Sequence, residues 1–117
     1  MIQQILDELI TSLAGSRAVV FLDGEGEMIS QSGDYDDDLK LLGAWKEIHL
    51  DHIREIAARL GLGAVNAVLF SLEEGNELIV PVAEDYCLLL FLSNFANVQD
   101  AITALKTTVQ RLRKDIE

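Results

Sequence analysis

Residues 60–92 read LGLGAVNAVLFSLEEGNELIVPVAEDYCLLLFL, and their pattern decides the expected fold. Short polar turns divide this stretch into three apolar segments, at 64–72, 77–82 and 86–92. Their β-branched, aromatic and leucine side chains favour strands, and links this short make neighbouring strands antiparallel. The last segment is apolar without alternation, so we expect other elements to cover both of its faces. Pro81 has no backbone N–H, so it is expected at a strand end or an unpaired position.

The N-terminal part supplies a helix and a hairpin. Apolar side chains recur at helical spacing over residues 2–14, and Gly15 follows as a helix stop. Residues 17–23, RAVVFLD, are typical of a strand, and residues 27–32 are its expected partner. The intervening DGEG is expected to be a turn and not a phosphate loop, because it opens a hairpin, lacks the GxxxxGK pattern and carries two acids.

Two further helices complete the pattern. The acidic run at 36–38 precedes a periodic segment, and its carboxylates can cap a helix that runs to about residue 60. Asn97 is the expected cap of a final helix over 98–116. The first of these helices is expected to have one broad side, formed by Leu42, Trp45, Ile48, His49, His52, Ile53, Ile56, Ala57 and Leu60.

These elements predict a single α+β domain over residues 1–117, in the order α-β-β-α-β-β-β-α. We expect a five-stranded antiparallel sheet with helices on both faces. The chain has 20 acidic and 9 basic residues, and its net charge of −11 disfavours nucleic acid and anionic membranes as partners. A single cysteine allows no internal disulfide, and the sequence shows no signal peptide or membrane span, so a cytoplasmic location is expected.

The order of elements and several local strings resemble the Roadblock/LC7 family over nearly the whole chain. The resemblance rests on AVVFLDGEGEMISQSG at 18–33, on the stretch 60–92 quoted above, and on the helix from Ala96. The turn at Asp23, the glycine-rich break after the long helix and the strand from Tyr86 match the family pattern in order and spacing. Longin and profilin-like domains share this layout but usually differ in strand order and helix placement.

The resemblance implies a dimer, either of this chain with itself or with a related Roadblock chain. In the family, the central helices of two subunits pack together and the adjoining edge strands pair. The resemblance also implies that the partner is a small Ras-like GTPase, which is activated or recruited without a donated catalytic arginine. The chain is therefore expected to be a non-enzymatic docking module. The alternatives are a structural light-chain or scaffold subunit of a larger complex and a small-molecule sensory domain.

The residues themselves also favour self-association. The expected strand over 64–72 contains no proline or lysine, which commonly protect an exposed sheet edge. Trp45 either completes the core of one subunit or contacts a second copy, beside two histidines on the same helix. The expected dimer interface is formed by Trp45, His49, His52, Ile56, Val65, Ala67, Val68 and Phe70.

No pattern of residues predicts a catalytic, cofactor-binding or metal site. His49 and His52 share a helical face, but a metal ion needs three or four converging ligands, so a packing role is expected. Cys87 has no histidine close in sequence, and we expect it to be a small core side chain. The acidic run at 36–38 lacks the ligand spacing of a calcium loop, which favours a helix cap.

Overall fold

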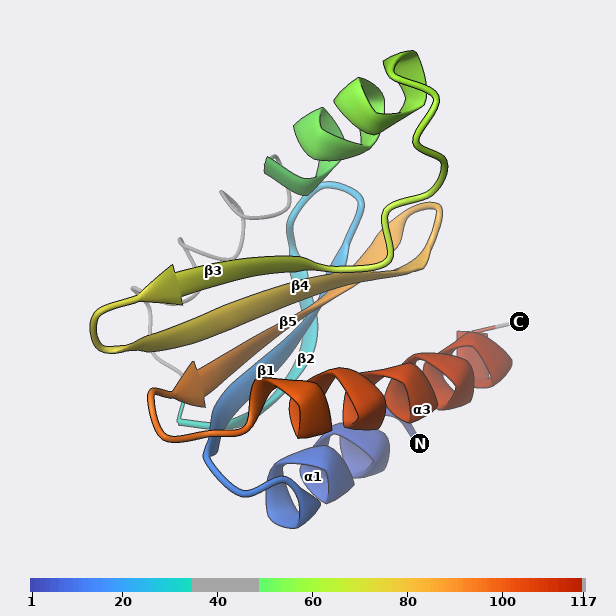
Figure 1. Cartoon of the computed structure of the whole chain (residues 1–117). Helices are drawn as coiled ribbons and strands as arrows, with labels where there is room; N and C mark the ends of the chain where they lie inside the picture. The colour runs from blue at the N-terminus through green and yellow to red at the C-terminus, as the bar shows by residue number, and fades with distance from the viewer. Residues whose placement is uncertain (35–48, 117) are drawn as a thin grey trace.

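The computed structural model describes residues 1–34 and 49–116, and it confirms the expected α+β fold and element order (Figure 1). The helix between β2 and β3 is described over residues 49–59 and is called the central helix below. Its expected start near residues 36–38 lies outside the described residues. The other elements are α1 (Ile2–Ser12), β1 (Ser16–Asp23), β2 (Met28–Gly33), β3 (Val68–Leu72), β4 (Gly75–Ala83), β5 (Tyr86–Ser93) and α3 (Val98–Ile116).

The five strands form one sheet in the order β2-β1-β5-β4-β3. All neighbouring pairs are antiparallel, as the short links predicted for β1–β2, β3–β4 and β4–β5. The β1–β5 pair joins distant parts of the chain, so no link length could predict it. This pairing places β1 and β5 inside the sheet and leaves β2 and β3 as its two edges.

Helices α1 and α3 lie side by side on one face of the sheet (Figure 1). Their apolar stripes point toward the strands, so Leu6, Leu105 and Leu112 are fully buried. These stripes follow the helical spacing of the sequence, because residues three or four apart share one face of a helix. The core on this side also contains Ile5, Leu9, Leu13, Val19, Phe21, Leu78, Val80, Val82, Leu88, Leu90, Leu92 and Ala101.

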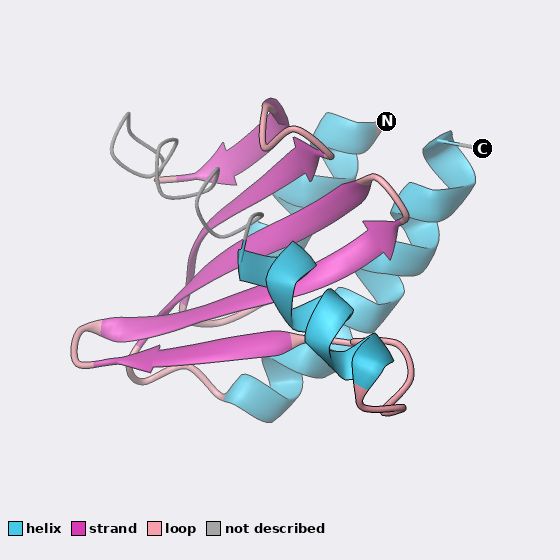
Figure 2. Ribbon diagram, turned by 90° about the horizontal axis from the view of Figure 1, so that it is seen from above, coloured by secondary structure: helices cyan, strands magenta, loops and turns pink. Residues whose placement is uncertain are grey.

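The central helix crosses the opposite face of the sheet, as Figure 2 shows from above. Its Leu50 is buried there in a second, smaller core with Ala18, Val20, Leu22, Ile79, Cys87, Leu89 and Phe91. Residues 87–92 of β5 are therefore buried from both sides, which confirms the interpretation of this unbroken apolar strand. The expectation of helices on both faces is also confirmed.

The strand expected over 64–72 begins only at Val68, so its predicted first part is wrong. Val68 pairs with Ile79, and continuing the same register would place Asn66 opposite Pro81. Because proline has no N–H to donate, a ladder weakens at that point. The structure agrees with the expectation that Pro81 is unpaired on one side, since no described residue of β3 lies opposite it.

The predicted turn at Asp23, the cap at Asn97 and the helix stop at Gly15 are confirmed, whereas the predicted cap at 36–38 lies outside the described residues. The Asp23 carboxylate accepts hydrogen bonds from the backbone N–H groups of Glu25 (2.9 Å) and Glu27 (3.0 Å), which closes the DGEG turn. At the start of α3, the Asn97 side chain accepts the backbone N–H of Asp100 at 3.0 Å. Gly15 has a φ of +85°, a backbone conformation that suits glycine after a helix.

Candidate functional site

Strand β3 forms one border of the sheet and has no partner strand on its outer side within the described residues. Its side chains alternate between the two faces. Val68 and Phe70 are half-buried against the central-helix core, whereas Leu69 on the other face is exposed. Leu72, at the end of the strand, is also exposed. Leu69 pairs with the buried Leu78 but remains 46 % exposed. An apolar edge strand with free backbone groups is a template for pairing with another chain.

Three of the expected interface residues lie on the described part of the central helix, and all three are exposed. His49, His52 and Ile56 are exposed, while Leu50 and Ala57 are buried. The side of this helix that packs on the sheet is therefore narrower than the sequence pattern indicated. Leu50 and Ala57 are the buried residues of the described helix, Ile53 is half-buried, and Ile56 is left at the surface. Trp45, the remaining expected residue of this helix, lies outside the described residues.

The expected interface residues that follow the helix differ in their burial. Val65, Val68 and Phe70 are half-buried against the core under the central helix, whereas Ala67 is exposed. The ring centroids of His49 and Phe70 are 6.4 Å apart, with the rings tilted by 43°. This contact brings the exposed side of the central helix next to β3. The two elements therefore form one surface, although half of the strand's apolar side chains also serve the core.

Four exposed leucines belong to the same region and were missed in the sequence. They lie at the end of the central helix, in the following loop and on β3, at Leu60, Leu62, Leu69 and Leu72. The available signal was the pattern LGLG at 60–63. Gly61 and Gly63 have φ values of +70° and +85°, so the helix stops and the intervening leucine has no helix face to join. Leu62 is accordingly 73 % exposed.

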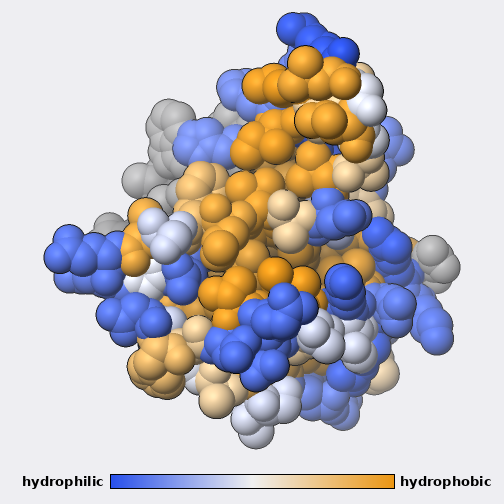
Figure 3. Space-filling model, in the orientation of Figure 1, coloured by the Kyte–Doolittle hydropathy of each residue, from blue (hydrophilic) through white to orange (hydrophobic). Residues whose placement is uncertain are grey.

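Figure 3 shows the result as hydrophobic surface that extends from the end of the central helix toward α3. Exposed apolar side chains scattered singly are ordinary, but a contiguous patch of this kind marks an interaction site. The exposed large apolar side chains in this part of the chain are Ile56 on the helix, Leu60 and Leu62 just after it, and Leu69 and Leu72 on β3. This surface is therefore the candidate site.

The perturbed carboxylates lie elsewhere, on α1. Hydrogen bonds from the Ser32 hydroxyl and the Gln3 side chain lower the pKa of Asp7. The Arg111 guanidinium lowers the pKa of Glu8 across a distance of 2.6 Å. Both groups hold neighbouring elements together.

The described part of the chain gives little support for a metal site, a reactive cysteine or a membrane-spanning helix. Within residues 1–34 and 49–116, no three side chains of the His, Cys, Asp and Glu type are grouped so that they could hold a metal ion. Cys87 is buried in β5, as expected for a core side chain. Among the described helices, none combines the length and the apolar character needed to cross a bilayer.

Solved structures reveal what this arrangement resembles. A Roadblock/LC7 domain from Streptomyces avermitilis matches with a TM-score of 0.89 at 17 % identity, over 97 % of this chain and 96 % of that one. MglB from Myxococcus xanthus matches with a TM-score of 0.88 at 18 % identity, over 98 % of this chain and 94 % of MglB. An MglB structure with a tetrameric arrangement matches with a TM-score of 0.87 at 15 % identity, over 97 % of this chain and 85 % of that one.

The chain is also similar in structure to a profilin. Profilin IB from Acanthamoeba castellanii covers 100 % of both chains, but its TM-score is 0.72 and its identity is 11 %. No protein-family model and no curated protein matches the sequence significantly. The matches with TM-scores of 0.87 to 0.89 agree with the resemblance seen in the sequence, whereas a second Roadblock/LC7 domain structure from Streptomyces scores 0.71, close to profilin IB. This chain has the fold of the Roadblock/LC7 domains.

Proposed function

We propose that this chain is a non-enzymatic Roadblock/LC7 module that pairs with a second copy of itself, or with a related chain, and docks a small Ras-like GTPase. The observation that carries the proposal is the unpaired apolar edge of β3, which lies beside the exposed side of the central helix. Pairing of two β3 strands would extend the sheet through both copies. It would also bring together the exposed leucines of two copies.

An isologous contact suits this surface, because both partners then present the same patch. Residues His49, His52 and Ile56 would face their counterparts or neighbours across the two-fold axis. Leu60 and Leu69 would lose their exposed apolar area to the partner, and such burial is favourable by roughly 25 cal/mol per Å². The tetrameric arrangement of one MglB structure supports self-association for a chain with this fold.

The GTPase half of the proposal rests on the sequence resemblance and on the likeness to MglB. The described residues support binding over catalysis, because the exposed region is apolar. It contains two histidines but no described nucleophile paired with a base. A module of this kind would activate or recruit the GTPase by arranging the GTPase's own residues. A cytoplasmic location follows from that partner.

The proposal is tested in two steps with the whole chain. Sedimentation equilibrium at micromolar concentration should give a dimer or a higher assembly, and a persistent monomer would contradict the pairing of β3. Small Ras-like GTPases from the same genome are then loaded with GDP or a GTP analogue and titrated with the protein. Binding, with or without faster GTP hydrolysis, supports the docking role. If no GTPase binds at tens of micromolar, the proposed docking role is wrong.

A further inference from the structure

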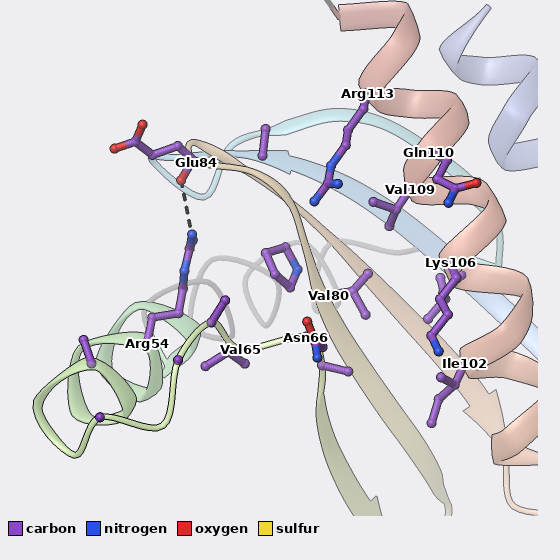
Figure 4. A pocket seen from close by; sticks show the side chains of 18 residues that line it. Arg54, Val65, Asn66, Val80, Glu84, Ile102, Lys106, Val109, Gln110 and Arg113 are labelled. Atoms are coloured by element: carbon purple, nitrogen blue, oxygen red, sulfur yellow. Dashed lines mark hydrogen bonds between the residues drawn. The ribbon is translucent and has the colours of Figure 1, made fainter.

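A groove runs between the loop after the central helix and the outer side of α3. Its volume is about 1020 Å³, and β4 lies along its floor. One bank is formed by residues 63–67 together with Arg54 and Ala58 of the central helix, and the other bank by residues of α3 from Ile102 to Arg113. Figure 4 shows these two banks facing each other across Val80. The groove is thus distinct from the outer edge of β3.

The groove exists because β3 starts late. The pairing of β3 with β4 ends at Val68 and Ile79, so residues 80–83 of β4, which pair with β5 on one side, have no described strand on the β3 side. Loop residues 63–67 line the opposite bank instead of pairing in the sheet. The floor is apolar, since Val80 and Leu105 are buried and Val109 is half-buried. A bare strand edge along an apolar floor accommodates an extended segment of another chain.

The rim of the groove is basic. Arg54 lies on one bank, and Lys106 and Arg113 lie on the other, against the single acidic residue Glu84. The chain has only 9 basic residues against 20 acidic ones. Three basic side chains around one groove therefore give it a local charge opposite to that of the whole molecule. The protein's overall field repels an acidic partner, and this groove is a local exception that can hold one.

The basic side chains are only lightly engaged within the chain. Arg113 donates through Nε to the Val82 carbonyl, which directs its guanidinium over the groove (Figure 4). Arg54 donates to the Glu84 carbonyl at 3.5 Å, a long and weak contact. Lys106 is exposed on α3 and reaches toward the same space. All three cations can therefore meet a carboxylate without breaking an ion pair described in this structure.

We propose that this groove binds an extended acidic segment of a partner protein, with apolar side chains against Val80 and Val109 and carboxylates against Arg54, Lys106 and Arg113. Carboxylates bound to guanidinium and ammonium groups form strong, directional hydrogen bonds. The groove goes beyond the docking surface proposed above, because its basic rim of Arg54, Lys106 and Arg113 has no part in that surface. Its lining shares Val65 and Ala67 with the expected interface. A chain that pairs through β3 still presents it.

The test uses a fluorescein-labelled peptide of about eight residues that alternates Glu with Leu and Val, a length of roughly 26 Å when extended. Fluorescence anisotropy with the full chain should show binding that weakens as salt rises. A peptide with Lys in place of every Glu should not bind. Lys106→Glu should weaken binding of the acidic peptide by about tenfold or more, since an attraction becomes a repulsion.

Lys114→Glu is the matched control, because it makes the same charge change on α3 outside the groove. It should bind the acidic peptide like the parent chain. Both lysines are exposed, so thermal unfolding should stay unchanged in both variants. Equal binding by Lys106→Glu and the parent, or equal binding of the Lys peptide, would overturn the proposal.

Two further outcomes identify a different occupant and would also overturn it. If Lys106→Glu dissociates the protein in sedimentation while the acidic peptide fails to bind, a second copy occupies the groove. If myristate binds the parent chain and the acidic peptide does not, the site takes a lipid anion. The proposal and the GTPase role fail separately, because Lys106→Glu should leave self-association through β3 intact.

Discussion

The two edges of the sheet differ in what lies beside them. At β2, the side chains of α1 hold the strand: Gln3 donates to the Gln31 carbonyl at 2.8 Å, and the Ser32 hydroxyl donates to Asp7 at 2.6 Å. At β3, no described strand or ion pair lies on the outer side, and Leu69 and Leu72 are exposed. One edge is closed by polar contacts within the chain, and the other is left apolar.

For the proposed self-association, this difference favours β3 as the edge that would meet a second copy. Polar side chains that bind the backbone of an edge strand compete with pairing by another chain, whereas free backbone groups flanked by leucines invite it. Strand length does not separate the two edges, since β2 spans 6 residues and β3 spans 5. The neighbouring helix decides the behaviour of each edge.

The largest effect is expected from a change that detaches β2. Gly33 has a φ of +90°, and a Cβ there would lie 2.3 Å from the Arg17 carbonyl oxygen. Gly33→Ala should therefore lower the free energy of unfolding by at least about 2 kcal/mol, from backbone strain and from the clash. Urea unfolding followed by circular dichroism measures it.

Gly24→Ala is the control for that change. It lies in the turn between β1 and β2, and a Cβ there would make ordinary contacts at 3.4 Å with Asp85. We expect a change of under ~0.5 kcal/mol, as for surface substitutions without a specific mechanism. Equal stability of the two variants would show that the end of β2 is not held as described.

An intermediate effect is expected from charge placed on one edge at a time. Leu69 on β3 and Ile29 on β2 are 46 % and 44 % exposed, so lysine at either position is tolerated in the folded chain. Leu69→Lys should weaken self-association by at least about tenfold, because it charges the pairing edge. Ile29→Lys should leave association unchanged. Sedimentation equilibrium of both variants makes the comparison, and the reverse result would assign the interface to β2.

The smallest effect concerns the contact that closes β2. The Ser32 hydroxyl and Gln3 lower the pKa of Asp7 below 3.8, so the ionised carboxylate is favoured in the folded chain. Its contribution to stability is therefore complete above that pKa and is lost as the pH falls through the lower folded value. Asp7→Asn should lower the melting temperature slightly at neutral pH. The difference between variant and parent should disappear in acid, and a difference independent of pH would contradict this account.

Much of the fold was predictable from local patterns. The stripes of α1 and α3, the turn at Asp23 and the cap at Asn97 depend on side chains near in sequence, so spacing was sufficient. The beginning of β3 was not predictable in this way. It depends on what would lie opposite Asn66, and Pro81 reaches that position only after the hairpin has formed.

The candidate site was predictable only in part. His49, His52 and Ile56 were assigned to an interface, and they are exposed beside β3. Val65, Val68 and Phe70 also fill the core, a division that sequence periodicity cannot express. Leu60 and Leu69 were not assigned to the interface. In the sequence, an apolar residue that its own chain buries cannot be told apart from one that is left exposed for a partner.

The amino-acid sequence by itself determined the helices and strands, their order and the antiparallel hairpins. It also determined a net negative charge that disfavours polyanions as partners. Those properties follow from backbone preferences, side-chain spacing and summed charge, which are local or additive. The tertiary structure decided which strands became edges, which apolar residues stayed at the surface and where three cations surround one groove. Each of these properties depends on which distant segments come together. The pairing of β1 with β5 joins the two halves of the sheet and so leaves β2 and β3 as its edges.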